Sequence, residues 1–382
     1  MRPLDTTDPV QEGYQAILQA ADRFCAHRWW QERLWLGCLL LIFWNVAPFF
    51  NLHYFNTPNW DAMETQSRAL LTPIGASADT HIEKMAFRLF LPSVAALLHI
   101  GRTGLFIGQV LAGVVFLRLL IRLSYELLQD KVATVFFVLA AAACYVCFSG
   151  FYDVFGRPDM YPYLFLLLAL SRRSPFAIWL ACVAAAWCDE RGLIHSTLVY
   201  LFWVLKEREH PRLRDVILPN RFAAAVPAAW VTYLAGRFLL SRYAGFQTGF
   251  ADIGRTVILE NSRYFALATF QTFGAAWLVI GLAFYLLFRL RLIAFGGALG
   301  AAFGLNWLTS VLVYDINRSL SYSFPVVLIS LLLFRQASRP AIRLVLFFAA
   351  VLSVLLPIGV WDGHYHYLPP LPVRLAEVFL RP

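Results

Sequence analysis

The sequence carries little charge for its length. Only 14% of its 382 residues are charged, whereas 60% belong to the hydrophobic set. Soluble globular domains contain about 25% charged residues, so this chain has too few of them to cover the surface of a soluble particle. The composition argues against a water-soluble enzyme and excludes a disordered chain, a collagen and an ordinary nucleic-acid-binding domain. It predicts a polytopic membrane protein.

Lysine is almost absent as well, since nearly all of the 32 basic residues are arginine. Together with abundant Ala and Leu, this favours a GC-rich bacterial source and hence a bacterial cytoplasmic (inner) membrane. No P-loop and no GxGxxG helix start is present, so a nucleotide-binding fold is not expected. The six cysteines lie in the N-terminal segment or in apolar stretches, and we expect no disulfide framework.

Residues 1–33, of mixed charge, precede the first apolar run, so we expect no cleavable signal peptide but a cytoplasmic N-terminal segment. Apolar side chains recur there at helical spacing, including Val10, Tyr14 and Ile17. This pattern predicts an amphipathic helix, either lying on the membrane surface or packed as an ordinary helix, and in both cases an anchor without chemistry.

Apolar runs long enough to approach a membrane span, about 20 residues, recur through the rest of the chain. We therefore predict an all-α transmembrane domain, residues 34–362, that forms a helical bundle of about eleven spans. The expected spans are 34–50, 105–123, 132–150, 158–171, 175–188, 192–205, 221–240, 264–288, 292–313, 319–334 and 342–361.

The basic residues predict the orientation of these spans. With the N-terminus in the cytoplasm, most Lys and Arg residues fall in cytoplasmic loops, and the whole net charge of +9 lies on that side. The same alternation predicts a long external loop at 51–86 and an external C-terminal tail at 363–382.

The stretch from Ser174 to Leu205 decides this parity. It is either one long tilted helix or two short helices joined at a charged triplet. We favour the hairpin, because a single helix would place the basic stretch 206–221 outside. Irregular, charged backbone at membrane depth is tolerated only where it lines a protein or water cavity.

Charged residues near membrane depth are costly and mark candidate functional sites. On this map they gather at the outer ends of the spans, where Asp61 and Glu64 lie in the first external loop and Arg88 heads an apolar helix. The turn near 153–163 interleaves aromatic rings with Asp153, Arg157 and Asp159. Rings and carboxylates of this kind suit a sugar site, although aromatic belts also occur at every membrane interface.

The triplet Asp189-Glu190-Arg191 is the costliest cluster and the strongest single signal. Its alternative interpretation is an internal Glu–Arg pair that locks two half-helices. Asp315 and Arg318 add another carboxylate and another arginine. Because the guanidinium fork binds phosphate in bidentate fashion, we expect a lipid-linked phosphate to be bound by the arginines and a sugar by the carboxylates. The expected phosphate ligands are Arg88, Arg157, Arg191 and Arg318, and the expected substrate-binding acids are Asp153, Asp159, Asp189, Glu190 and Asp315.

Four short segments carry a family resemblance: Trp60-Asp61-Ala62-Met63-Glu64, Arg88-Leu89-Phe90-Leu91-Pro92, Asp189-Glu190-Arg191 and Asp315-Ile316-Asn317-Arg318. In this arrangement the chain resembles the GT-C superfamily of integral-membrane glycosyltransferases, particularly bacterial multi-span members. The resemblance covers most of the chain. It implies a sugar donor carried on a polyprenyl phosphate and a reaction on the non-cytoplasmic face.

The resemblance further implies an acidic residue of the first external loop as catalytic base or metal contact. Asp61 is the first candidate and Glu64 the second. The chain lacks the adjacent acidic pair that many members carry after the first span, so the identity of the acid and a need for a divalent cation both stay open. No metal-ligand motif indicates a cofactor.

Two other functions compete with the glycosyltransferase: a lipid or solute transporter or flippase, and a non-catalytic lipid-binding subunit of an envelope assembly complex. Transporters often carry internal repeats with matching broken helices, and no such self-similarity is visible here. The expected partners are a polyprenyl-phosphate-linked sugar, membrane lipids and envelope-assembly proteins, with no nucleic acid.

Overall fold

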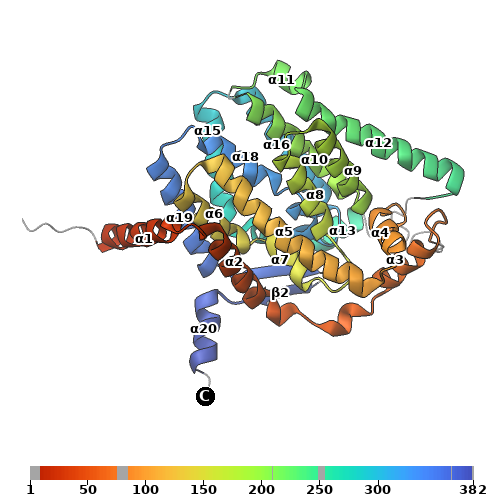
Figure 1. The fold of residues 1–382 in the computed structure, drawn as a ribbon, viewed down its shortest axis with the longest axis horizontal. Coiled ribbons are helices and arrows are strands. Elements are labelled where there is room, and N and C mark those ends of the chain that lie inside the picture. The colour runs from red at the N-terminus through yellow and green to blue at the C-terminus, as the bar shows by residue number, and fades with distance from the viewer. Residues whose placement is uncertain (1–8, 75–84, 209, 248–253, 363, 381–382) are drawn as a thin grey trace, which may run out of the picture.

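The computed structural model describes residues 9–74, 85–208, 210–247, 254–362 and 364–380, and most of these are helical (Figure 1). In chain order the first elements are α1 (Pro9–Ala26), α2 (Trp30–Val46), η1 (Ala47–Phe49), η2 (Leu52–Phe55), α3 (Pro58–Arg68), α4 (Phe90–Leu98), α5 (Arg102–Leu128), α6 (Lys131–Ala142), α7 (Tyr145–Tyr152), α8 (Met160–Ser171) and α9 (Pro175–Cys188).

The remaining elements are helices followed by a short hairpin and a last helix. They are α10 (Arg191–Glu207), α11 (Leu213–Ile217), α12 (Arg221–Ala244), α13 (Arg255–Asn261), η4 (Ser262–Tyr264), α14 (Phe265–Phe273), η5 (Gly274–Ala276), α15 (Trp277–Arg289), α16 (Ile293–Val311), α17 (Ile316–Ser321), α18 (Pro325–Phe334), α19 (Arg339–Leu355), β1 (Ile358–Asp362), β2 (His364–Leu368) and α20 (Leu371–Leu380).

The helices have membrane character. Within the described residues, three helical stretches are long and apolar enough to cross a bilayer: Arg102–Leu128, Leu213–Ala244 and Val257–Arg289. A fourth is added if the bent pair α6 and α7 counts as one span. The helices α8, α9 and α18 are apolar but shorter.

Ten of the eleven expected spans fall on a helix or on a run of successive helices; one of these ten is bent, and the eleventh ends early. The range 132–150 is not straight, because α6 and α7 meet at an angle of 52°. Cys144 adopts an extended backbone at the break, and its thiol contacts the carbonyl oxygen of Phe273 at 3.2 Å. Phe273 is the last residue of α14, so the contact with that helix stabilises the bend without a proline.

The last expected span, 342–361, ends early, although the fold as a whole is all-helical, as predicted. Helix α19 stops at Leu355, and β1 then pairs with β2 in an antiparallel hairpin whose register joins Ile358 to Leu368. The β-branched and aromatic residues of this stretch favour strand, and an Asp-Gly pair between two such runs is a hairpin signal. The expected external tail 363–382 therefore contains β2 and α20.

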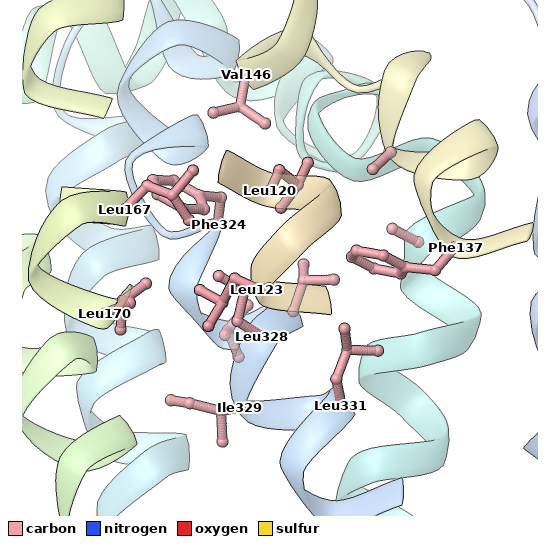
Figure 2. Packing of buried hydrophobic residues seen from close by; sticks show 14 of the residues in the cluster. Leu120, Leu123, Phe137, Val146, Leu167, Leu170, Phe324, Leu328, Ile329 and Leu331 are labelled. Carbon is pink, nitrogen blue, oxygen red and sulfur yellow. The ribbon is translucent and has the colours of Figure 1, made fainter. Parts of the chain in front are cut away.

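The core is centred on α18, whose ten residues are all buried. It packs against α5 and α8, and Leu120, Leu167 and Leu328, one from each helix, belong to the same cluster of buried side chains (Figure 2). A helix that is apolar all round is buried on every side, so α18 is the centre of the bundle. At the periphery, α12 runs along one edge and exposes Val231, Phe238 and Tyr243 (Figure 1).

One end of the bundle is held together by an ion pair and by hydrogen bonds to backbone carbonyl groups. Lys206, in the last turn of α10, lies 3.0 Å from Glu126 of α5. Arg335, after α18, donates to the carbonyl oxygens of Leu127 and Glu126 at 2.8 and 2.9 Å. These bonds satisfy carbonyl groups at the C-terminal end of α5, which have no partner inside their own helix.

The start of α6 is held in a similar way. The side chain of Asp130 accepts a hydrogen bond from the backbone N–H of Ala133 and thereby caps the helix. Its two oxygens also bind Arg343 of α19, at 2.7 and 3.1 Å. This pair joins α6 to α19, two helices that pack side by side.

Candidate functional site

The charged triplet forms the turn between α9 and α10. Helix α9 ends at Cys188 and α10 begins at Arg191, so the expected hairpin is confirmed. The two helices approach closely at Gly192, where a side-chain carbon would come within 2.7 Å of the carbonyl oxygen of Ala185. Glycine is needed here, because any larger residue would force the two helices apart.

The hairpin holds its own aspartate firmly. The Oδ1 atom of Asp189 accepts hydrogen bonds from the backbone N–H of Arg191 at 3.0 Å and from its Nε at 2.7 Å. The Nη2 atom of Arg191 lies 2.6 Å from Oδ2 of Asp189. Arg191 thus pairs with Asp189, two residues before it, whereas Glu190 pairs with Arg88.

Arg88, which precedes α4, binds both acids of the triplet. Its Nη1 lies 3.0 Å from Oδ2 of Asp189, and its Nε and Nη2 lie 3.4 and 3.5 Å from the carboxylate oxygens of Glu190. Burial alone would raise the pKa of Asp189, but Arg191 and Arg88 hold it well below its usual range. Asp189 is therefore an anion between two arginines.

Asp159, at the start of α8, connects the hairpin to the C-terminal third of the chain. Its Oδ1 atom accepts a hydrogen bond from Nη2 of Arg191 at 3.1 Å and from the hydroxyl of Tyr322 at 2.7 Å. Its Oδ2 atom lies 3.2 Å from Nε of Arg318. The guanidinium group of Arg191 also lies over the ring of Tyr322, 4.8 Å from its centroid, and donates to Ser319.

Arg318 and Asp315, at the start of α17, complete the assembly. Nη2 of Arg318 lies 3.2 Å from Asp315, which also lies 3.4 Å from Nη1 of Arg157. Arg318 is 7% exposed, and its Nη1 has no hydrogen-bond partner in the described part of the chain. Nε, although 3.2 Å from Asp159, likewise has no hydrogen-bond partner there, so buried donors of the guanidinium group are left unused.

Eight of the eleven predicted site residues thus form one continuous ion-pair network, with four positive and four negative groups. In order along the contacts they are Glu190, Arg88, Asp189, Arg191, Asp159, Arg318, Asp315 and Arg157.

The network borders a small, partly open pocket with a cavity volume of about 20 Å³. Its lining combines charged side chains with mostly apolar ones. The charged residues of the lining are Arg88, Arg157, Asp159 and Asp189, and the uncharged ones are Met63, Gln66, Ile74, Met85, Leu91, Pro92, Gly156, Pro158, Pro162 and Cys188.

Helix α3 contributes to the pocket lining and is fastened to the turn that carries Arg157. The Thr57 hydroxyl donates to the carbonyl oxygen of Phe155 at 2.8 Å, and Nε1 of Trp60 donates to that of Val154 at 2.8 Å. Gly156 has a φ of +78°, and a side-chain carbon there would lie 3.0 Å from the backbone nitrogen of Trp60. The close approach of helix and turn therefore requires glycine.

Asp61 and Glu64, the expected catalytic acids, lie on α3 but belong to a second cluster. Arg102, at the start of α5, binds Asp61 at 2.8 Å and Glu64 at 2.8 Å. The backbone N–H of Arg102 also donates to Glu64 at 3.0 Å. Neither acid is among the pocket-lining residues, whereas Met63 and Gln66 of the same helix are.

The two acids of this cluster differ in exposure. The side chain of Asp61 is 64% exposed and that of Glu64 is 26% exposed. The hydrogen bonds from Arg102 lower the pKa of Glu64 below its ordinary value. Asp61 is the more accessible of the two to an incoming group.

Asp153 lies outside both clusters. Its Oδ1 atom accepts a hydrogen bond from the backbone N–H of Phe155, and within the described residues it makes no ion pair. Burial raises its pKa to about 7, because the carboxylate form loses its hydration. The structure therefore separates this residue from the other acids of its turn.

Sequence reasoning missed three partners of these residues. Arg102 stands at the head of an apolar helix, the same signal that singled out Arg88, and it could have been found in that way. Tyr322 and Ser319 lie inside an apolar stretch, and nothing in their spacing distinguishes them from core residues.

Metal-ligand geometry is not found in the portion of the chain that the structure describes, since no three His, Cys, Asp or Glu residues are placed to hold an ion. No family model, no curated protein and no solved structure matches this chain.

Proposed function

We propose that the protein is a multi-pass membrane glycosyltransferase. It moves a sugar from a polyprenyl-phosphate donor to a lipid-linked or envelope acceptor on the non-cytoplasmic face of a bacterial inner membrane. The observation that carries the proposal is a pocket whose lining combines apolar side chains with Arg88 and Arg157, two members of an arginine network drawn from four separate segments of the chain.

The two kinds of lining residue match the two parts of such a donor. A polyprenyl phosphate joins an apolar chain to an anion, and Arg88 and Arg157 offer guanidinium groups beside Met63 and Leu91. Arginine binds phosphate oxygens in bidentate fashion and is more weakly hydrated than lysine. In the transfer step these arginines stabilise the negative charge that grows on the departing lipid phosphate.

Under this proposal a carboxylate takes the proton of the acceptor hydroxyl while the anomeric carbon passes from phosphate to acceptor. Asp61 remains the first candidate, since it is the exposed acid of α3, and Glu64 the second. Asp159 and Asp189 line the pocket but are each held by two arginines, which suits them to position those arginines. The sugar hydroxyls then meet the acids of the network.

The proposed topology has about eleven spans, with the N-terminus inside and the C-terminus outside. It is supported by the helices that occupy the expected ranges, several of which are shorter than a full span. In this orientation the pocket opens outward, and the basic stretch 206–221 lies in the cytoplasm. Cysteine accessibility of that stretch from the outside would overturn it.

The function is tested with the purified protein in lipid nanodiscs and a panel of radiolabelled polyprenyl-phosphate sugars, with a membrane lipid extract as acceptor. We expect release of polyprenyl phosphate and labelling of the extract. Binding of the donor without turnover indicates the non-catalytic subunit instead. A protein that shows no binding of the donor and no turnover would instead favour the transporter.

Two substitutions locate the chemistry. Asp61→Asn is expected to abolish transfer while the protein stays folded and inserted, and an unchanged rate would move the base first to Glu64. Arg88→Gln is expected to lower the rate by about a hundredfold or more, as for the loss of one donor to a developing anion. Arg118→Gln is the matched control, because Arg118 is 71% exposed and remote from the pocket lining.

A further inference from the structure

Glu190 is the most loosely held acid of the network. Its two contacts to Arg88, at 3.4 and 3.5 Å, are the longest in the cluster together with that of Arg157 to Asp315, at 3.4 Å. Its side chain is 35% exposed, against 3% for Asp189. Asp189 has two arginine partners and a backbone N–H, whereas Arg88 is the only partner of Glu190 in the described residues.

The two acids also occupy different edges of the same guanidinium group. Asp189 takes Nη1 of Arg88, and Glu190 takes Nε and Nη2. The Nε and Nη2 edge is one of the forks that binds a carboxylate or a phosphate through two parallel hydrogen bonds. Glu190 therefore occupies the edge that an incoming anion needs.

We propose that Glu190 is a placeholder anion that the phosphate of the incoming lipid displaces from Arg88. This inference rests on the proposed function and specifies how its donor enters. The resting network carries four positive and four negative groups, so a further anion with every carboxylate in place would leave buried negative charge uncompensated. Release of Glu190 into water restores the balance, because it is the one acid of the network with substantial exposure.

The exchange leaves Arg88 in position. Asp189 stays bound to Nη1 and keeps the guanidinium group oriented, while the phosphate takes Nε and Nη2. No bond other than hydrogen bonds and ion pairs changes in this step, and no proton is transferred. The site is thus kept neutral both before and after the donor binds.

The test is the affinity of the full-length protein in nanodiscs for polyprenyl phosphate and, in a separate titration, for inorganic phosphate. Glu190→Gln is expected to bind at least one of them about fivefold more tightly than the natural protein, because a partly exposed competing ion pair has been removed. Arg88→Gln is expected to lose this binding. A supporting role for Glu190 would instead make Glu190→Gln bind both probes equally or more weakly, which overturns the proposal.

A second variant guards against misfolding of the first. Glu190→Asp keeps the charge but withdraws it from Arg88 by one methylene group, and we expect a gain in affinity there as well. Glu126→Gln is the control, since Glu126 is also an ion-paired glutamate but pairs with Lys206 at the other end of α10. Its affinity is expected to be unchanged, and an equal gain in this control would overturn the proposal.

The binding assay separates this inference from the function on which it rests. Absence of turnover with an intact gain in Glu190→Gln refutes the transferase but leaves the displacement standing. Turnover in the natural protein without any gain in the two Glu190 variants refutes the displacement alone.

Discussion

The two ends of α10 both carry ion pairs between distant segments, but the pairs are connected differently. At the C-terminal end, Lys206 binds one acid, and the neighbouring pair of Asp130 and Arg343 stands apart from it. At the N-terminal end, Arg191 shares both Asp189 and Asp159 with further arginines. Pairs that cap or join helix ends stabilise the bundle, whereas a shared network beside a hollow can exchange partners with a ligand.

Loss of a shared arginine is expected to have the largest effect. Arg191→Gln leaves two almost fully buried carboxylates with fewer partners, and removal of one member of a buried pair costs about 3–5 kcal/mol. Unfolding in detergent micelles, followed by circular dichroism, measures this loss. Arg118→Gln, in an exposed pair at 3.8 Å, is expected to change stability by less than about 1 kcal/mol. Equal losses in the two variants would erase the distinction between the two regions.

Two matched aspartates compare the regions in function. Asp189→Asn releases the orienting charge between Arg88 and Arg191 and is expected to lower the transfer rate about a hundredfold, since small misplacements of reacting groups have effects of this size. Asp130 is about as buried as Asp189 but caps α6 at the opposite end of the bundle. Asp130→Asn is therefore expected to keep the transfer rate per folded molecule. Initial rates with the polyprenyl-phosphate sugar measure both. A comparable loss in Asp130→Asn would contradict the assignment of function to one end.

The end of the bundle at which Asp130 pairs with Arg343 is tested by a stability measurement of its own. Arg343→Gln removes a two-point contact to Asp130 and is expected to cost about 1–2 kcal/mol of stability, because Asp130 still caps Ala133. Affinity for polyprenyl phosphate is expected to stay as in the natural protein. Weaker lipid binding in this variant would show that the two ends are coupled.

The smallest expected effect concerns pH and the cluster on α3. Arg102 lowers the pKa of Glu64, so the contribution of this contact to stability is present above the ordinary carboxyl pKa and is lost as the pH falls through the lowered value. The melting temperature of the natural protein is expected to fall more steeply below pH 4.5 than that of Glu64→Gln. The corresponding difference in the free energy of unfolding is expected to be below about 1 kcal/mol. Parallel curves would show that the contact does not contribute.

Much of this arrangement could be predicted from the sequence because charge is scarce in it. An Asp-Glu-Arg triplet inside apolar sequence cannot lie within a lipid-facing helix, so the turn before Arg191 was predictable. A charge near membrane depth is costly without a partner, and this cost also predicted that four arginines converge: Arg88, Arg157, Arg191 and Arg318. The local sequence of a short helix does not determine which of its sides packs against the rest of the protein. The pairing of Asp61 on α3 with Arg102 therefore could not be predicted.

The breaks in the helices were harder to predict for a related reason. The bend near Cys144 contains no proline or glycine, and it depends on packing against α14, a segment far along the chain. The hairpin of β1 and β2 follows an apolar helix without a polar interval, so a hydropathy pattern extends the helix into it.

The missing side chain at Gly156 lets the turn that carries Arg157 approach α3 beside the pocket. Because no β-carbon separates the turn from α3, Arg157 on the turn and Met63 on the helix line the same pocket. A larger residue at position 156 would push the turn away from α3. It would thereby change which headgroups fit the pocket, without altering any charge in the molecule.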